Sequence, residues 1–143
     1  MLNFALVGCG RIAKRHSELL GLNQIPNASL VAVCDIDIIK AKTLGERFGI
    51  PYYADMEEMI NKVNSIDVLV VLTESGYHAN NVIRLAKYKK HLIVEKPMAL
   101  SLIDADKMIN ECKQNNIRLF VVKQNRFNVP VIKLKEALDQ GRF

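Results

Sequence analysis

The residues best suited to chemistry stand near the start of the chain, where an apolar run meets two glycines. Residues 2–7 have the composition of a short buried strand, and Gly8, Gly10 and Ala13 follow with the spacing G-x-G-x-x-A. The first glycine permits a tight turn, the second leaves room for a pyrophosphate, and the alanine lets a helix pack closely on the sheet. The N-terminus of such a helix presents free N–H groups to phosphate. The pattern therefore predicts a dinucleotide site.

A carboxylate at the end of the second apolar run extends this pattern. Asp35 directly follows residues 30–34, and an acidic residue at this place accepts hydrogen bonds from ribose hydroxyls and repels a 2′-phosphate. Residues 36–38, Ile-Asp-Ile, contain no Arg or Lys that could hold such a phosphate. We therefore expect NAD(H) rather than NADP(H). The alternative is that Asp35 only caps the next helix, although Asp37 is better placed for that role. The residues assigned here to cofactor binding are Gly8, Gly10, Arg11, Ile12, Asp35 and Ile36.

A second candidate group, Glu95-Lys96-Pro97, follows the apolar residues 92–94. The carboxyl ends of parallel strands face the ligand crevice of an open α/β sheet. A lysine at this edge can donate a hydrogen bond to a substrate hydroxyl and help to move the hydroxyl proton while hydride leaves the carbon. The tripeptide alone is common on protein surfaces. Its position after a predicted strand makes Lys96 the candidate catalytic residue.

Predicted strands and helices alternate along the chain. Strands are predicted at residues 2–7, 30–34, 51–53, 67–72, 92–94 and 119–122, and helices at 12–22, 38–48, 55–62, 77–88, after Ser101 and from about 131. Asp37, Ser101 and Gly49 are expected to cap helices. Residues 67–72 are almost continuously apolar, as in a strand buried on both faces. This order is typical of a Rossmann-type α/β fold, a doubly wound parallel sheet with helices on both faces.

Composition narrows the class of protein. The 143 residues are half hydrophobic and about a quarter charged, with a net charge of +5, which suits a soluble globular domain. No apolar run is long enough to span a membrane, and no signal peptide is recognised. The three cysteines are widely spaced, which predicts reduced thiols in a cytoplasmic protein. Tryptophan is absent and only residues 87–90 form a basic cluster, so we expect no nucleic-acid partner.

The three histidines do not predict a metal site. His16, His78 and His91 do not share metal-ligand spacing with cysteines or carboxylates. His16 is expected to be an exposed helix residue and His91 to be structural. His78 differs, because it stands at a helix start on the ligand edge of the sheet, where contact with the cofactor is expected.

Several segments together resemble the family of glucose-fructose oxidoreductases, inositol dehydrogenases and rhizopine-catabolism proteins. The resemblance covers essentially the whole chain and is carried by residues 7–13, 33–35, 72–78 and 91–99. It implies the N-terminal cofactor domain of an NAD(P)-dependent oxidoreductase of sugars or polyols. The residues 73–76, Thr-Glu-Ser-Gly, depart from the Thr-Pro-Asn of many members, so the shape of this loop is not implied.

The resemblance also implies roles for individual residues. Lys96 matches the active-site lysine of the family, while Thr73, His78 and Glu95 match positions along the nicotinamide half of the cofactor. Leu72, which precedes Thr73, is assigned to the same cofactor site.

Two segments, residues 94–100 and 122–128, look most like the branch that oxidises UDP-N-acetylglucosaminuronic acid at C3 in lipopolysaccharide and surface-polysaccharide synthesis. In that reading Arg126 binds a carboxylate or diphosphate, and Asn125 contacts a hydroxyl or the cofactor amide. Lys96 and Arg126 are then the substrate-binding residues. The alternative for Arg126 is a salt bridge that anchors a domain junction.

The expected domain organisation is a cofactor domain at residues 1–128, followed at 129–143 by the start of a connection to a C-terminal domain. The resemblance implies that this further domain binds the sugar or nucleotide-sugar substrate and forms a homo-oligomer. Two alternatives stay open: a dehydrogenase of a free sugar or inositol, and a non-catalytic NAD(H)-binding module such as a redox sensor.

Overall fold

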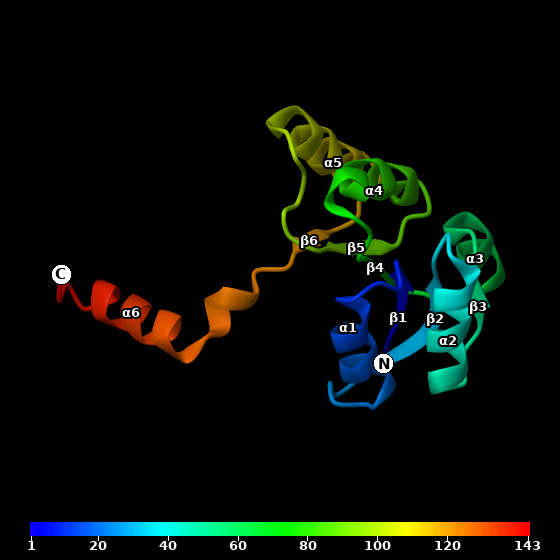
Figure 1. The fold of residues 1–143 in the computed structure, drawn as a ribbon. Helices are drawn as coiled ribbons and strands as arrows, with labels where there is room; N and C mark the ends of the chain where they lie inside the picture. Colours follow the sequence, from blue (N-terminus) through cyan, green and yellow to red (C-terminus); the bar gives the residue numbers. More distant parts are fainter.

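The computed structural model describes all 143 residues, and its strands and helices alternate as predicted (Figure 1). The strands are β1 (Leu2–Val7), β2 (Ala28–Cys34), β3 (Tyr52–Tyr53), β4 (Val68–Val71), β5 (His91–Val94) and β6 (Leu119–Val121). The helices are α1 (Ala13–Gly21), α2 (Ile38–Phe48), α3 (Met56–Lys62), α4 (His78–Ala86), α5 (Leu102–Gln114) and α6 (Val129–Asp139). Two short 3₁₀ turns, η1 (Ser75–Tyr77) and η2 (Gln124–Phe127), precede α4 and α6.

All six strands are parallel and form one sheet in the order β3-β2-β1-β4-β5-β6. The chain order reverses between β1 and β4, which is where open α/β sheets bind ligands. Val7 pairs with both Cys34 and Val71, and Val71 pairs with Val94. Because the strand ends are in register, the loops that follow them leave the sheet at one edge. The predicted doubly wound parallel fold is confirmed.

The core consists of two apolar layers, one on each face of the sheet. The smaller layer packs α1 and α2 against the sheet and includes Leu6, Leu20 and Leu30. The larger layer lies under α3, α4 and α5 and includes Met59, Leu85 and Met108 (Figure 1). All four residues of β4 are buried, which agrees with the continuous apolar pattern of its sequence. Burying each large aliphatic side chain contributes about 1.5–3 kcal/mol to folding.

Local signals in the sequence correctly place several helix ends. The carboxylate of Asp37 accepts a hydrogen bond from the Ile39 N–H at 3.1 Å, and α2 ends at Gly49 with φ 65°. The hydroxyl of Ser101 accepts from the Asp104 N–H at 3.1 Å. The helix predicted at 77–88 is observed as α4 at His78–Ala86, and the 3₁₀ turn η1 directly precedes it.

Helix α6 projects away from the sheet (Figure 1), and η2 is the element that it mainly contacts. Its apolar side chains are exposed, among them Val129, Leu134 and Leu138. The assignment of residues 129–143 to a connection with a further domain stays a prediction. None of the helices combines the length and apolar character needed to cross a membrane.

Candidate cofactor and substrate site

A cavity of about 600 Å³ opens where the chain leaves β1, β2 and β4. The sheet register explains its position, because the residues that follow these strands stand side by side at the carboxyl edge. Six of the residues that the sequence assigns to cofactor binding line this cavity: Gly8, Gly10, Asp35, Ile36, Leu72 and Thr73.

The two glycines of the loop after β1 serve different purposes. Gly8 has φ 103°, and a Cβ atom there would lie 2.8 Å from the carbonyl carbon of Leu72. Gly8 therefore permits the close approach of the loop to the end of β4. A Cβ atom on Gly10 would meet no atom within 4 Å. Gly10 therefore leaves space in the cavity beside the start of α1.

The N-terminus of α1 offers unpaired donors at this place. The N–H groups of Gly10, Arg11 and Ile12 donate to no acceptor in the protein. Ala13, the first residue of α1, is buried and brings the helix close to the sheet. Free N–H groups and the positive end of the helix dipole favour an anion, and the gap at Gly10 admits one. These residues fit the diphosphate of a dinucleotide.

Asp35 lies across the ends of β1 and β2. Its Oδ2 accepts a hydrogen bond from the Cys9 N–H at 2.7 Å, and its Oδ1 accepts from the Asp37 N–H at 2.8 Å. Each carboxylate oxygen can accept a further bond from a ribose hydroxyl. Asp37, as expected, is the residue that caps α2. The alternative in which Asp35 serves only as a helix cap is therefore not what the structure shows.

Burial makes the neighbouring thiols unreactive. It raises the pKa of Cys9 and of Cys34 to about 12, with a smaller contribution to each from nearby negative charge. All three cysteines are unpaired, as expected for reduced thiols. The thiol of Cys9 donates to the carbonyl of Cys34 at 3.5 Å, so it helps to fix the loop that follows β1.

The far wall of the cavity comes from α4 and the residue that caps it, and it was not predicted from the sequence. Tyr77, the N-cap residue, and Asn81 and Arg84 within α4 line the cavity at a spacing of about one residue per helical turn. Lys40 of α2 lines the same cavity. Two cations, Lys40 and Arg84, thus line the cavity, although residues 36–38 contain none. The i, i+4, i+7 spacing on α4 was visible in the sequence, but nothing there indicated which way that helix face points.

A second cavity of about 600 Å³ lies at the ends of β5 and β6. It is lined only by polar and charged residues: Lys96, Lys123, Gln124, Asn125 and Arg126. The structure thus brings together Lys96, Asn125 and Arg126, the three residues that the sequence singled out at this edge. Lys123 was not singled out, although it immediately precedes them. The side chain of Lys96 is exposed, and its ammonium has no partner in the protein.

Glu95 is a buried carboxylate directly before Lys96, and its contacts fix the backbone at this second site. The residue is 7% exposed, and its Oε1 lies 2.9 Å from Nε2 of His16. Its Oε2 accepts from the Lys96 N–H at 3.1 Å. The expectation that His16 is simply exposed was wrong, because the ring is half-buried against Glu95. His16 stands three residues after Ala13, on the side of α1 that reaches the end of β5.

His78 joins the two loops that border the cavities. Its ring is 1% exposed, with Nδ1 2.8 Å from the Pro97 carbonyl oxygen and Nε2 2.9 Å from the Thr73 carbonyl oxygen. The Thr73 hydroxyl also accepts from the Asn81 amide at 3.0 Å. His78 lines neither of the two cavities. Its contact with the cofactor stays a prediction, while its hydrogen bonds tie the loop after β4 to the loop after β5.

Comparison with known proteins agrees with this geometry. A family model described as an oxidoreductase family with an NAD-binding Rossmann fold matches residues 2–123. Myo-inositol 2-dehydrogenase of Thermotoga maritima is 36% identical over 141 residues, which are 98% of this chain and 41% of the relative. The chain thus spans about two fifths of the length of this relative.

Two similar solved structures contain a bound nicotinamide cofactor. The WlbA dehydrogenase of Bordetella pertussis, in complex with NADH and UDP-GlcNAcA, is 37% identical with a TM-score of 0.93, covering 99% of this chain and 43% of that one. An oxidoreductase of Agrobacterium radiobacter, in complex with NAD⁺, L-tartaric acid and magnesium, is 30% identical with a TM-score of 0.89, covering 98% and 40%.

Proposed function

The chain belongs to the oxidoreductase family with an NAD-binding Rossmann fold, and from this premise we propose that it is the cofactor-binding part of an NAD-dependent dehydrogenase of a sugar hydroxyl. The cavity at the ends of β1, β2 and β4 takes the adenosine and diphosphate. The N–H groups of Gly10, Arg11 and Ile12 bind the diphosphate, and Asp35 accepts from the adenosine ribose. Ile36 lies beside the base.

The nicotinamide half extends toward β5 in this proposal. Leu72 and Thr73 line the near cavity, and Glu95 and Asn125 follow β5 and β6. His78 begins α4 and contacts the loops after β4 and β5. When bound there, NAD would supply the acceptor for the hydride of the carbon that carries the hydroxyl. Two contacts fix the backbone around Lys96: Glu95 accepts from the Lys96 N–H, and the His78 ring contacts the Pro97 carbonyl oxygen.

The substrate proposed is UDP-N-acetylglucosaminuronic acid, oxidised at C3. The observation that carries this choice is the polar cavity with three cations, those of Lys96, Lys123 and Arg126. Such a site favours an anionic sugar, and a guanidinium binds a carboxylate with two parallel hydrogen bonds. The similarity to the B. pertussis enzyme, whose structure holds this nucleotide sugar, supports the same choice.

Lys96 is the proposed catalytic residue. Its ammonium has no acceptor in the protein, so it is available to the oxygen of the substrate hydroxyl. In this proposal the hydroxyl proton passes to a base of the further domain. Negative charge grows on the oxygen as the proton leaves, and the adjacent ammonium stabilises that charge. Glu95 supports the position of Lys96, because its carboxylate is held by His16 and accepts from the Lys96 N–H.

A second candidate function is the oxidation of an inositol, favoured by the 36% identity to the T. maritima enzyme. An inositol carries no charge, so the three cations would then have no anionic group to bind. The two proposals are separated by measuring NADH formation with the natural full-length protein. The substrates to compare are UDP-N-acetylglucosaminuronic acid, UDP-N-acetylglucosamine, which lacks the carboxylate, and myo-inositol.

We expect activity with the uronic acid alone, and Arg126→Gln to raise its KM about tenfold or more. Lys96→Met is expected to lower kcat by about 10²- to 10⁴-fold. Lys113→Met, an exposed change on α5, is the matched control and keeps full turnover. Activity with myo-inositol alone contradicts the nucleotide-sugar proposal. NADH binding without turnover of any substrate favours the non-catalytic module.

A further inference from the structure

The adenosine cavity contains two cations that could, by charge alone, hold a 2′-phosphate. Lys40 of α2 and Arg84 of α4 both line the cavity into which Asp35 faces. An NADP site needs such cations, because the 2′-phosphate is an anion that Arg and Lys bind well. The presence of Asp35 therefore does not by itself account for a preference for NAD.

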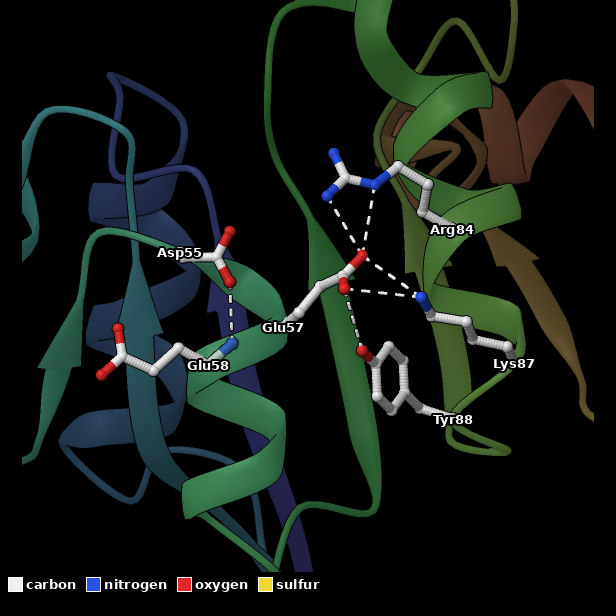
Figure 2. Close-up of polar contacts among 6 residues, drawn as sticks. All are labelled: Asp55, Glu57, Glu58, Arg84, Lys87 and Tyr88. Carbon is white, nitrogen blue, oxygen red and sulfur yellow. Dashed lines mark hydrogen bonds and ion pairs between the residues drawn. The ribbon is translucent and has the colours of Figure 1, made fainter.

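Each of the two cations is paired with a carboxylate that does not line the cavity. Nζ of Lys40 lies 3.4 Å from Oδ2 of Asp37. Nε and Nη2 of Arg84 donate to the same oxygen of Glu57, at 3.3 and 3.1 Å. Figure 2 shows this carboxylate between α3 and α4, with the guanidinium directed toward it.

Glu57 is the centre of a larger cluster. Besides Arg84, it accepts from the Lys87 ammonium, 3.4 Å from either oxygen, and from the Tyr88 hydroxyl at 3.1 Å (Figure 2). The hydrogen bond from Arg84 is the main reason that the pKa of Glu57 lies below its ordinary value. Glu57 therefore remains an anion at neutral pH and keeps its hold on the guanidinium.

We propose that Glu57 is a specificity-determining residue of the cofactor site, which selects NAD over NADP by holding the Arg84 guanidinium away from a 2′-phosphate. Glu57 acts through Arg84 and is a positioning residue. Selection then has two parts, since Asp35 repels the phosphate and the carboxylates of Glu57 and Asp37 engage the cations that would attract it. This proposal rests on the assignment of the cavity to adenosine made above.

The size of the effect follows from the exposure of the pair. The side chains of Arg84 and Glu57 are 46% and 29% exposed, and such ion pairs are weak in water. In the wild type a 2′-phosphate must first draw Arg84 away from Glu57, so the gain on removing Glu57 is limited to the strength of this pair, about two- to fivefold in affinity. Glu57→Gln keeps the shape of the side chain and removes its charge.

The test measures the affinity of the chain for four ligands by calorimetric titration: NADH, NADPH, 5′-AMP and 2′,5′-ADP. We expect Glu57→Gln to bind 2′,5′-ADP and NADPH about two- to fivefold more tightly than the wild type, with 5′-AMP and NADH unchanged. Glu57→Asp keeps the charge but withdraws the carboxylate by one methylene, so it is expected to give a smaller gain in the same direction. This second variant keeps the test decisive if the first folds poorly.

Three controls separate geometry from net charge. Glu58→Gln removes the same charge from the same helix, but Glu58 pairs with Lys62 and does not contact Arg84, so no gain is expected. Adding Arg84→Gln to Glu57→Gln is expected to abolish the gain. Adding Lys87→Gln is expected to retain it, because Lys87 does not line the cavity.

A gain that is equal in Glu58→Gln, or that persists without Arg84, overturns the proposal in favour of a general effect of charge. The same affinity for 2′,5′-ADP in wild type and in both Glu57 variants also overturns it. A wild-type chain that binds neither 5′-AMP nor NADH refutes the assignment of the adenosine cavity itself, and this proposal with it. Failure of the assignment is thus distinguished from failure of the specificity mechanism.

Discussion

Replacing either glycine of the loop after β1 by alanine adds one methyl group, and we expect one replacement to affect mainly stability and the other mainly cofactor binding. Replacing Gly8 by alanine adds a Cβ atom at φ 103°, a backbone region that residues with side chains rarely adopt. The same atom would lie 2.8 to 2.9 Å from the backbone of Leu72 and Thr73. This backbone ends the buried strand β4, so it has little freedom to move aside.

The magnitude follows from these two causes. A residue held at an unfavourable positive φ costs about 1–3 kcal/mol, and an overpacked contact costs about 1–3 kcal/mol more. Gly8→Ala is therefore expected to lower the free energy of unfolding by about 2–6 kcal/mol. For a chain of this length, each kcal/mol shifts Tm by roughly 3 °C, so the expected drop in Tm is roughly 6–18 °C.

Gly10→Ala provides the matched comparison. A Cβ atom at Gly10 meets no atom within 4 Å, so stability is expected to change by no more than about 0.5 kcal/mol. The added methyl group occupies the space proposed for the diphosphate, and NADH is expected to bind at least about tenfold more weakly. Thermal unfolding and titration with NADH measure the two effects. A Gly8→Ala chain as stable as the wild type, or a Gly10→Ala chain with unchanged NADH affinity, would refute the reasoning.

Three further predictions follow from the polar groups of the site. His16→Ala removes a partner of the buried Glu95 carboxylate, and urea unfolding is expected to show a loss of about 1–3 kcal/mol; an unchanged midpoint contradicts this. Hydrogen bonds, first from Arg84, lower the pKa of Glu57 from 4.5, so its contribution to stability is present above that pH and lost as the pH falls through the folded-state pKa. The Tm difference between wild type and Glu57→Gln is therefore expected to shrink only below about pH 4.5, and a difference independent of pH counts against the pairing. Burial raises the thiol pKa values of Cys9, Cys34 and Cys112 to about 12, 12 and 11. Iodoacetamide at about pH 8 is therefore expected to label the unfolded chain but hardly the folded one. Equal labelling of the folded and the unfolded chain would contradict the burial of these thiols.

The loop after β1 and the helix caps could be predicted because their causes are local. Gly8 and Gly10 follow an apolar strand at fixed spacing, and Asp37 bonds to a backbone group two residues away. Such contacts form within one turn of the chain and depend little on what packs around them. The alternation of apolar segments likewise predicted the parallel sheet, because each segment must bury its apolar face against a neighbouring layer.

The positions of many site residues could likewise be predicted from the sequence. Six of those assigned from the fingerprint or from the family resemblance line one cavity, and Lys96, Asn125 and Arg126 line the other. All of these residues stand within about five positions after the end of a strand, so a correct prediction of strand ends was sufficient to place them at one edge. Their roles toward cofactor and substrate remain proposals.

The side-chain contacts between elements far apart in the sequence could not be predicted. His16 and Glu95 stand 79 positions apart, and Glu57 and Arg84 stand 27 apart, so no pattern in the sequence links them. A polar residue on a helix has the same appearance in the sequence whether it faces water or another element, which is why His16 was expected to be exposed.

By itself, the sequence determined the strand and helix segments, the glycine loop and the presence of Asp35 and Lys96 at strand ends. Only the tertiary structure decided which cations share the cavity with Asp35 and which carboxylates restrain them. The physical reason is that helical periodicity defines a face of α4 but not its direction, which depends on the packing of α4 against α5 and against β5 and β4 of the sheet. The position of Arg84 beside Glu57 is a consequence of that packing.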